Sequence, residues 1–272
     1  MLLITGASGG LGTLVAGHFA GRDDVVLGTR RPAEGERHVD FDDPASLDFS
    51  GIDTLLLISA GEGEDDIVIR RHEAAISAAE KAGVRHIVYT SLSGDGDHLA
   101  YALAHRWTER RLRWSSVNWT ILRNGLYAEF LAAIAAPGDP DLTITAPLGR
   151  VRLAAAARAD LAEVAATVST DPAAHAGKVY ELVGEVAFGG AELAAAVGGS
   201  YEPSSLATAR EALAGSVSHA FQVPMLVGTY SAIAGGFLDG AALPRGELRA
   251  LLGRAPQSAI EVYAATVRAS AS

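Results

Sequence analysis

The chain has 272 residues, of which 49% are hydrophobic, and a formal net charge of −10. This is enough apolar material for the core of one α/β domain, alone or with a smaller appended lobe, and it excludes a disordered chain. The acidic balance argues against nucleic acid or an anionic membrane as the main partner, and the absence of cysteine excludes disulfides, thiolate catalysis and cysteine-ligated metals.

The first twelve residues predict a dinucleotide site. An apolar strand over Leu2–Ile4 breaks off at Thr5–Gly6, and a helix is expected from about Leu11 to Ala20. Between them, the glycines permit a tight turn and a close approach of the backbone to a pyrophosphate, which the helix N-terminus attracts. The alternative is an ordinary glycine-rich turn. The residues expected to bind the cofactor phosphates are Gly6, Ala7, Ser8, Gly9, Gly10, Leu11 and Gly12.

The end of the second strand, Val25–Gly28, indicates which dinucleotide is bound. Enzymes that prefer NAD place a carboxylate there, about 20 residues after the glycine motif, to hold the ribose 2′-hydroxyl. This chain has Thr29, Arg30 and Arg31 instead. A guanidinium suits a phosphate, so the pattern favours the 2′-phosphate of NADP(H) over a merely solvated turn.

The next elements alternate as strand and helix, which predicts a Rossmann-like, doubly wound parallel sheet in an α/β fold. No helix is expected between the second and third strands, because Pro32 and Gly35 indicate a loop. We expect strands at Arg37–Phe41, Asp53–Ala60, Arg85–Ser91 and Asn118–Arg123, and helices at Ile67–Ala82 (ended by Gly83) and His98–Trp114. Residues 1–124 would form the NADP-binding domain.

Residues 125–272 lack this alternation and predict a smaller, mostly helical lobe that covers the substrate, with some strands able to rejoin the main sheet. We expect strands at Leu142–Ala146 and Lys178–Val183, and helices at Leu126–Ala136, Arg158–Ser169, Ala191–Val197, Ser205–Leu213, Met225–Ala234, Gly246–Leu252 and Gln257–Val267. No basic leader precedes the first strand and the apolar runs are too short to cross a bilayer, so we expect a cytoplasmic protein. We also expect a monomer or a homodimer.

Residues after the third and fourth strands could complete the cofactor site. Asp40 could accept a hydrogen bond from the adenine amino group, with Phe41 beside the ring. Ile58, Ser59 and Ala60 end the fourth strand, where small residues let the backbone pass beside the nicotinamide ribose.

Ser91, Tyr101 and His105 are similar to the Ser/Tyr/Lys constellation of short-chain dehydrogenases. Tyr101 and His105 are four residues apart, so on a helix they would share one face. A tyrosine with an ordinary pKa of about 10 needs a permanent cation to become a useful acid, and histidine is mostly neutral at pH 7. The pattern therefore disfavours Tyr101 as the acid and leaves it open, while His105 could donate a hydrogen bond to the ribose or the substrate. No metal-binding spacing occurs.

The chain resembles the NmrA-like atypical short-chain dehydrogenases/reductases, particularly the bacterial NAD(P)H:quinone oxidoreductases (type 2) and triphenylmethane reductases. The resemblance covers nearly the whole chain. Its motifs are ITGASGGLG (4–12), LLLIS (55–59), AGVRHIVYTSL (82–92), TILRNGLYAEF (120–130), RADLAEVAA (158–166), GKVYELVG (177–184) and ELRALLGRAPQS (247–258).

This resemblance implies NADP phosphates at Gly6–Gly12 and the 2′-phosphate at Arg30, with adenine by Asp40–Phe41. It implies that the nicotinamide end lies near Ser59, His105 and the segment Asn124, Gly125, Leu126 and Tyr127, with Tyr127 also a candidate catalytic residue. Two departures from the family pattern are the short segment between the second and third strands and the presence of Tyr101.

The resulting hypothesis is an NADPH-dependent reductase that transfers hydride to a flat, electron-poor acceptor such as a quinone. Such an acceptor can take its proton from water, so no strong protein acid is required. Two alternatives are a non-catalytic NADP(H)-sensing regulator of the NmrA type and a tyrosine-dependent carbonyl reductase.

Overall fold

The structure is a computed structural model that describes residues 1–60, 63–94, 99–241 and 243–270. The chain forms two compact units. Unit 1 comprises Met1–Leu92, Leu103–Arg123 and Ala159–Tyr180, and unit 2 comprises Ser93–Ala102, Asn124–Arg158 and Glu181–Ser272. The domain division proposed at residue 124 stays a prediction.

A seven-stranded sheet in the order β3-β2-β1-β4-β5-β6-β8 organises unit 1. The pairings of β1 with β2 and β4, of β2 with β3, and of β4 with β5 are all parallel. The strand order reverses between β1 and β4, which is where ligands bind in open α/β sheets. The strands are β1 (Leu2–Ile4), β2 (Val25–Thr29), β3 (Arg37–His38), β4 (Thr54–Leu57), β5 (His86–Leu92), β6 (Asn118–Asn124) and β8 (Val179–Leu182).

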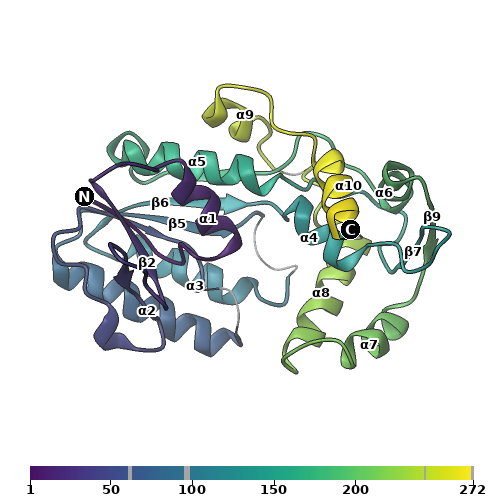
Figure 1. Cartoon of the computed structure of the whole chain (residues 1–272), viewed down its shortest axis with the longest axis horizontal. Coiled ribbons are helices and arrows are strands. Elements are labelled where there is room, and N and C mark those ends of the chain that lie inside the picture. Colours follow the sequence, from purple (N-terminus) through teal and green to yellow (C-terminus); the bar gives the residue numbers. More distant parts are fainter. Residues whose placement is uncertain (61–62, 95–98, 242, 271–272) are drawn as a thin grey trace. The chain divides into compact units, whose positions relative to one another are not determined.

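Helices cover both faces of this sheet, α1 and α5 on one face and α2 and α3 on the other (Figure 1). Every residue of β4 is buried, as a continuous apolar run predicts for a strand covered on both sides. The predicted doubly wound parallel fold is therefore confirmed. The helices are α1 (Gly10–Gly17), α2 (Asp65–Ala82), α3 (Ala102–Arg113) and α5 (Arg158–Thr170), with short 3₁₀ turns at Pro44–Ser46 and Pro172–His175.

Several predicted boundaries in this unit were wrong: α1 ends at Gly17 and not at Ala20, and β4 covers Thr54–Leu57 and not Asp53–Ala60. The strand expected over Arg37–Phe41 ends at His38, because Ser46 hydrogen-bonds both the backbone N–H and the carbonyl of Asp40 and pulls the chain into a turn. The helix expected over His98–Trp114 begins at Ala102, and His98 lies outside the described residues. Tyr101 therefore precedes the helix, and it does not share a helix face with His105.

Unit 2 is mostly helical and has its own core. Two buried tyrosines close the end of α4, because the Tyr230 hydroxyl donates to the Ile134 carbonyl (2.6 Å) and the Tyr263 hydroxyl to the Ala135 carbonyl (2.5 Å). These bonds satisfy carbonyls that a helix end leaves unpaired. The helices are α4 (Ala128–Ile134), α6 (Gly190–Val197), α7 (Leu206–Ala214), α8 (Gln222–Ala234), α9 (Glu247–Leu252) and α10 (Ala259–Ser270).

A second, two-stranded parallel sheet joins β7 (Thr143–Ala146) to β9 (Ser200–Pro203). The sequence did not predict β9, because its four residues are mostly exposed and show no apolar alternation. The strand exists through its pairing with β7, which lies 57 residues earlier at the pair Thr143–Ser200. Among the described residues, no helix is both long and apolar enough to cross a membrane.

Candidate functional site

The glycine turn after β1 forms a cradle of exposed backbone. Gly6 has a φ of +60°, a left-handed conformation that glycine adopts without strain. Its carbonyl accepts the N–H of Gly9 (2.9 Å), which precedes α1 and provides no side-chain cap. A Cβ on Gly12 would overlap the Gly6 carbonyl and approach Ala7 Cα to 2.8 Å. The N-terminus of α1 therefore presents N–H groups that no side chain caps, and glycine at position 12 leaves room for the turn to pack against the helix. Such exposed N–H groups suit a pyrophosphate.

A hydrogen-bonded threonine joins this turn to the end of β4. The Thr5 hydroxyl donates to the Leu56 carbonyl (3.2 Å) and accepts the backbone N–H of Ile58 (3.0 Å). The turn also contacts β2, since the N–H of Ala7 donates to the Gly28 carbonyl (3.2 Å). Three neighbouring strands thus present their carboxyl ends together.

Arg30 and Arg31 are exposed immediately after β2. Neither side chain has a hydrogen bond or ion pair with a residue that the structure describes. The loop that carries them is held instead by Glu36, whose carboxylate accepts the N–H of Ala33 (2.8 Å). Two guanidiniums are therefore available to a phosphate.

The loop containing Asp40 and Phe41 is fixed by a neighbouring ion cluster. Asp42 pairs with Arg71 (2.5 Å) and Arg70 (2.9 Å), and hydrogen bonding by Arg71, with that by Arg70, lowers the pKa of Asp42 to about 2. One Asp40 carboxylate oxygen accepts the N–H of Asp42 (3.0 Å), and Phe41 packs against the core of the unit. An adenine contact by these two residues stays a prediction.

The end of β4 rests on a buried network of rings and hydroxyls. The N–H of Ser59 donates to Thr90 Oγ1 (3.0 Å), and the N–H of Ala60 donates to His72 Nε2 (3.0 Å). Because His72 Nε2 accepts, its Nδ1 carries the proton toward Thr108 Oγ1 (2.8 Å). Ser59 Oγ is buried without a hydrogen-bond partner among the described residues, so a polar group of a ligand would find an unused partner there.

His105 belongs to this network. Its Nδ1 lies 2.8 Å from the buried Tyr89 hydroxyl, and the two rings lie 6.1 Å apart. Burial lowers the pKa of His105 to about 4, so the ring is neutral at pH 7. This excludes an imidazolium acid at neutral pH, and the predicted hydrogen bond from His105 to a ribose or substrate stays a prediction.

Buried neutral histidines predict acid sensitivity. Burial lowers the pKa of His72 to about 3 and of both His86 and His105 to about 4. The unfolded chain, with histidine pKa values of about 6.5, binds more protons between pH 6.5 and 4, so stability falls as the pH falls through this range. Denaturant titrations at pH 7 and 5 should show this loss, and His105→Gln should reduce it. Stability that does not change from pH 7 to 5 would contradict the assignment.

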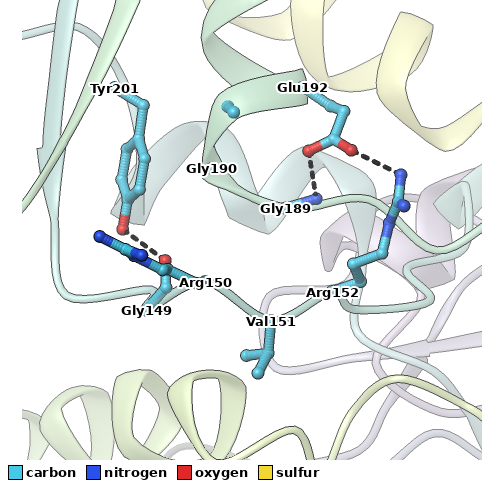
Figure 2. A pocket seen from close by; sticks show the side chains of 9 residues that line it. Gly149, Arg150, Val151, Arg152, Gly189, Gly190, Glu192 and Tyr201 are labelled. Carbon is cyan, nitrogen blue, oxygen red and sulfur yellow. Dashed lines mark hydrogen bonds and ion pairs between the residues drawn. The ribbon is translucent and has the colours of Figure 1, made fainter.

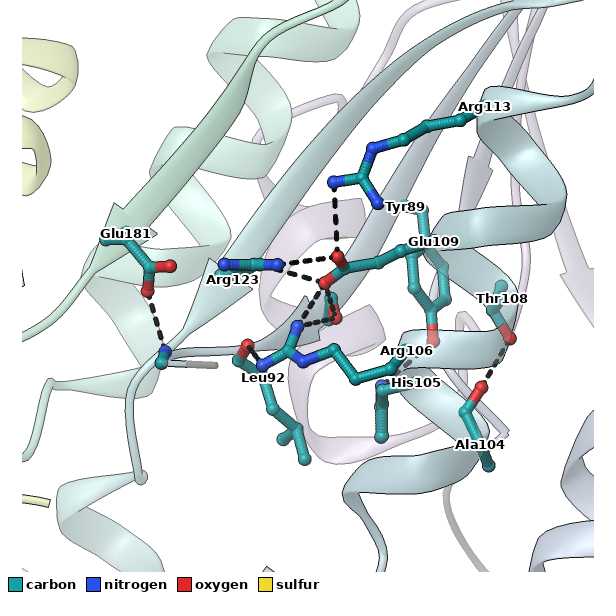
Figure 3. A network of polar contacts seen from close by, with 12 residues as sticks. Tyr89, Leu92, Ala104, His105, Arg106, Thr108, Glu109, Arg113, Arg123 and Glu181 are labelled. Atoms are coloured by element: carbon teal, nitrogen blue, oxygen red, sulfur yellow. Dashed lines mark hydrogen bonds and ion pairs between the residues drawn. The ribbon is translucent and has the colours of Figure 1, made fainter. Parts of the chain in front are cut away.

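A second buried cluster, not predicted from the sequence, surrounds Glu109 on α3 (Figure 3). This carboxylate is 1% exposed and binds Arg123 through two hydrogen bonds of 2.9 and 2.8 Å. Arg106 and the Ser91 hydroxyl also donate to it. Burial alone would raise the pKa of Glu109, but the hydrogen bonds from Arg123 and Ser91 and the charge of Arg106 lower it overall. The sequence signals were the spacings of Arg106 and Arg113 from Glu109 on one helix, three and four residues away.

The predicted residues of unit 2 lie around the end of β6. Asn124 is 4% exposed, and no donor among the described residues reaches its Oδ1. Gly125 follows, with its N–H bonded to the Leu182 carbonyl (2.9 Å), so close that a Cβ would approach this oxygen to 3.1 Å. Burial raises the pKa of Tyr127, against smaller lowering effects of Asn124 and Arg158.

Tyr101 also belongs to unit 2, beside Thr229 of α8. Burial raises its pKa, with Thr229 opposing this shift to a smaller extent. No lysine or arginine is among the groups that shift the pKa of Tyr101. This environment makes Tyr101 a weaker acid than free tyrosine, and its role in catalysis stays a prediction.

A small pocket of about 240 Å³ lies elsewhere in unit 2 (Figure 2). Arg152 and Glu192 form an ion pair at its rim (2.5 Å), and the Glu192 carboxylate also accepts the N–H of Gly189 (3.1 Å). No predicted site residue lines it. Its lining residues are Gly149, Arg150, Val151, Arg152, Gly189, Gly190, Ala191, Glu192 and Tyr201.

Comparison with known proteins places residues 6–172 in an NAD(P)H-binding family. The chain is 38% identical to quinone oxidoreductase 2 of Escherichia coli over 211 residues, 72% of each chain. It is also similar to the crystal structure of NADPH-dependent quinone oxidoreductase from E. coli in complex with NADPH, with a TM-score of 0.85, 31% identity and complete coverage of both chains. The triphenylmethane reductase of Citrobacter sp. with NADP(H) gives a TM-score of 0.86 at 26% identity, covering 97% of this chain and 99% of that one.

Proposed function

The chain belongs to the NAD(P)H-binding family, and from this premise we propose that it is an NADPH-dependent reductase that transfers hydride to a flat, electron-poor acceptor such as a quinone. The observation that carries this proposal is the uncapped glycine turn together with two arginines after β2 whose side chains no described residue binds. The names of the similar enzymes, which include a quinone oxidoreductase and a dye reductase, support the acceptor class.

In this proposal unit 1 binds the cofactor. Gly6, Ala7, Ser8, Gly9, Gly10, Leu11 and Gly12 hold the pyrophosphate, while Arg30, with Arg31, holds the 2′-phosphate. Asp40 and Phe41 contact the adenine. Ile58, Ser59, Ala60 and His105, with Asn124, Gly125 and Leu126, hold the nicotinamide end. Ser59 Oγ and Asn124 Oδ1, which are buried and have no hydrogen-bond partner among the described residues, support this assignment.

Bound NADPH supplies the hydride, and the protein positions the acceptor for attack. A quinone takes the two electrons of the hydride at one end and one proton from water, giving the hydroquinone and NADP⁺. Neutral His105 and the phenol of Tyr127 would act as hydrogen-bond donors to the acceptor oxygens, since neither is a strong acid at pH 7. A cytoplasmic location and a monomeric or homodimeric state stay predictions.

Steady-state consumption of NADPH with a panel of quinones and triphenylmethane dyes, with NADH in parallel, tests the proposal. We expect turnover with quinones and a preference for NADPH. Tight NADPH binding without oxidation by any acceptor would favour the NADP(H)-sensing alternative. A large loss of carbonyl reduction in Tyr101→Phe would favour the tyrosine-dependent reductase.

Arg30 should set the preference for NADPH. Arg30→Gln removes charge-assisted hydrogen bonds to the 2′-phosphate and should lower kcat/KM for NADPH about 10- to 100-fold. The value for NADH, which lacks this phosphate, should change less than about threefold. Arg22→Gln is the matched control, because Arg22 is exposed in the same unit and paired with Asp24. Equal losses with both cofactors would refute the assignment of Arg30.

A further inference from the structure

We propose that Arg158 binds an anionic group of the acceptor, such as a carboxylate, sulfonate or phosphate. The inference rests on the proposed function and adds to it a residue that selects among acceptors. Arg158 is the first residue of α5 and belongs to unit 2, as does the candidate catalytic residue Tyr127.

The guanidinium of Arg158 is held over Tyr127. Its central carbon lies 5.0 Å from the centroid of the Tyr127 ring, in a cation–π arrangement. The two backbone segments run side by side, because the N–H of Ala128 donates to the Ala156 carbonyl and the N–H of Ala156 donates to the Leu126 carbonyl, both at 2.9 Å. The local fold therefore fixes a cation beside the phenol.

Apart from its contact with the Tyr127 ring, this guanidinium has no hydrogen bond or ion pair with any residue in the described ranges. The Glu129 carboxylate accepts the backbone N–H of Arg158, at 3.1 and 3.2 Å, and does not bind its side chain. By contrast, Arg111 and Arg123 each bind carboxylates through at least two nitrogens. A guanidinium fork matches two oxygens of a carboxylate, sulfonate or phosphate.

A second, independent observation indicates a ligand at the same place. The side chain of Asn124 is close enough to Tyr127 to lower the pKa of its phenol. The buried Oδ1 of Asn124 has no hydrogen-bond donor among the described residues. A buried acceptor left unpaired is costly, and a ligand hydroxyl or amide would satisfy it. Tyr127 and Arg158 thus offer a phenol and a cation beside Asn124, whose oxygen the proposed function assigns to the nicotinamide end of the cofactor.

The anion could come from the acceptor or from the cofactor. We assign it to the acceptor because the glycine turn and Arg30 already account for the pyrophosphate and the 2′-phosphate. An acceptor with an aromatic ring and an adjacent anion would place the ring by Tyr127 and the anion at Arg158.

The test compares 1,4-naphthoquinone with 1,4-naphthoquinone-2-sulfonate as acceptors for the NADPH-loaded protein. Arg158→Gln should lower kcat/KM for the sulfonate about 10- to 100-fold, while the neutral quinone changes less than about threefold. Arg158→Lys should restore part of the loss. Arg152→Gln is the control, because Arg152 is an exposed arginine of the same unit that is already paired with Glu192. Circular dichroism melts would verify that each variant is folded.

Other outcomes overturn the proposal. Equal losses with both quinones would show that Arg158 does not select anions, and a raised KM for NADPH with the neutral quinone would assign the anion to the cofactor. If the wild type reduces neither quinone, the proposed function fails, and calorimetric titration of naphthalene-2-sulfonate into the NADP⁺-loaded protein decides the inference. Binding weakened about tenfold by Arg158→Gln would support an anion site, and unchanged binding or none would reject it.

Discussion

Replacing Gly12 by alanine is expected to weaken NADPH binding about 100-fold and to lower the free energy of unfolding by about 1–3 kcal/mol. The added Cβ would overlap the carbonyl oxygen of Gly6 and approach Ala7 Cα to 2.8 Å, and both are backbone atoms that cannot rotate away. The turn must then move away from α1, which would displace the N–H groups that we propose hold the pyrophosphate. Fluorescence titration with NADPH and urea denaturation measure the two effects.

Gly17→Ala is the matched control in the same helix. A Cβ at Gly17 meets nothing within 4 Å, so alanine there should stabilise the protein by about 0.5–1 kcal/mol through its higher helix propensity and leave NADPH binding unchanged. The cradle assignment would be wrong if Gly12→Ala bound NADPH as tightly as Gly17→Ala does.

Glu109→Gln is expected to lower the free energy of unfolding by about 3–5 kcal/mol. The glutamine keeps the volume but removes the charge that compensates Arg106 and Arg123, whose side chains are only 18% and 17% exposed. Its amide group would also direct N–H donors at these guanidiniums. Urea denaturation at pH 7 measures the loss, and the NADPH KM of the folded fraction should change little.

The exposed pair Arg22–Asp24 provides the comparison for Glu109. The two side chains are 43% and 59% exposed, and Asp24→Asn should cost no more than about 1 kcal/mol because solvent screens an exposed pair. A loss in Glu109→Gln as small as that in Asp24→Asn would mean that the buried cluster is not a structural requirement of unit 1.

The glycine turn and the continuous apolar strand were predictable because each depends on short-range patterns. The apolar run that contains Leu55–Leu57 is typical of a strand covered on both faces, and the glycines of residues 6–12 permit a turn that bulkier residues would block. These local constraints are strong enough to predict the sheet and the cofactor class without tertiary information.

The partners of polar side chains were not predictable in this way. Glu109 meets Arg123 from β6 and Ser91 from β5, and no spacing in the sequence connects these three residues. The pairing of β9 with β7 is likewise a contact between distant segments that individually carry little apolar pattern.

Tyr101 and His105 illustrate the same difference between local patterns, which the sequence predicts, and tertiary contacts, which it does not. Their four-residue spacing suggested a shared helix face, but the helix begins one residue after Tyr101, and burial against separate neighbours determines the pKa of each. The sequence by itself determined the sheet and the glycine turn, because these follow from propensity and spacing within a few residues, while the binding of the cofactor by Arg30 and Arg31 stays a prediction. Only the tertiary structure decided which polar atoms are paired, which are neutral and which remain available, because those properties depend on neighbours brought together by folding.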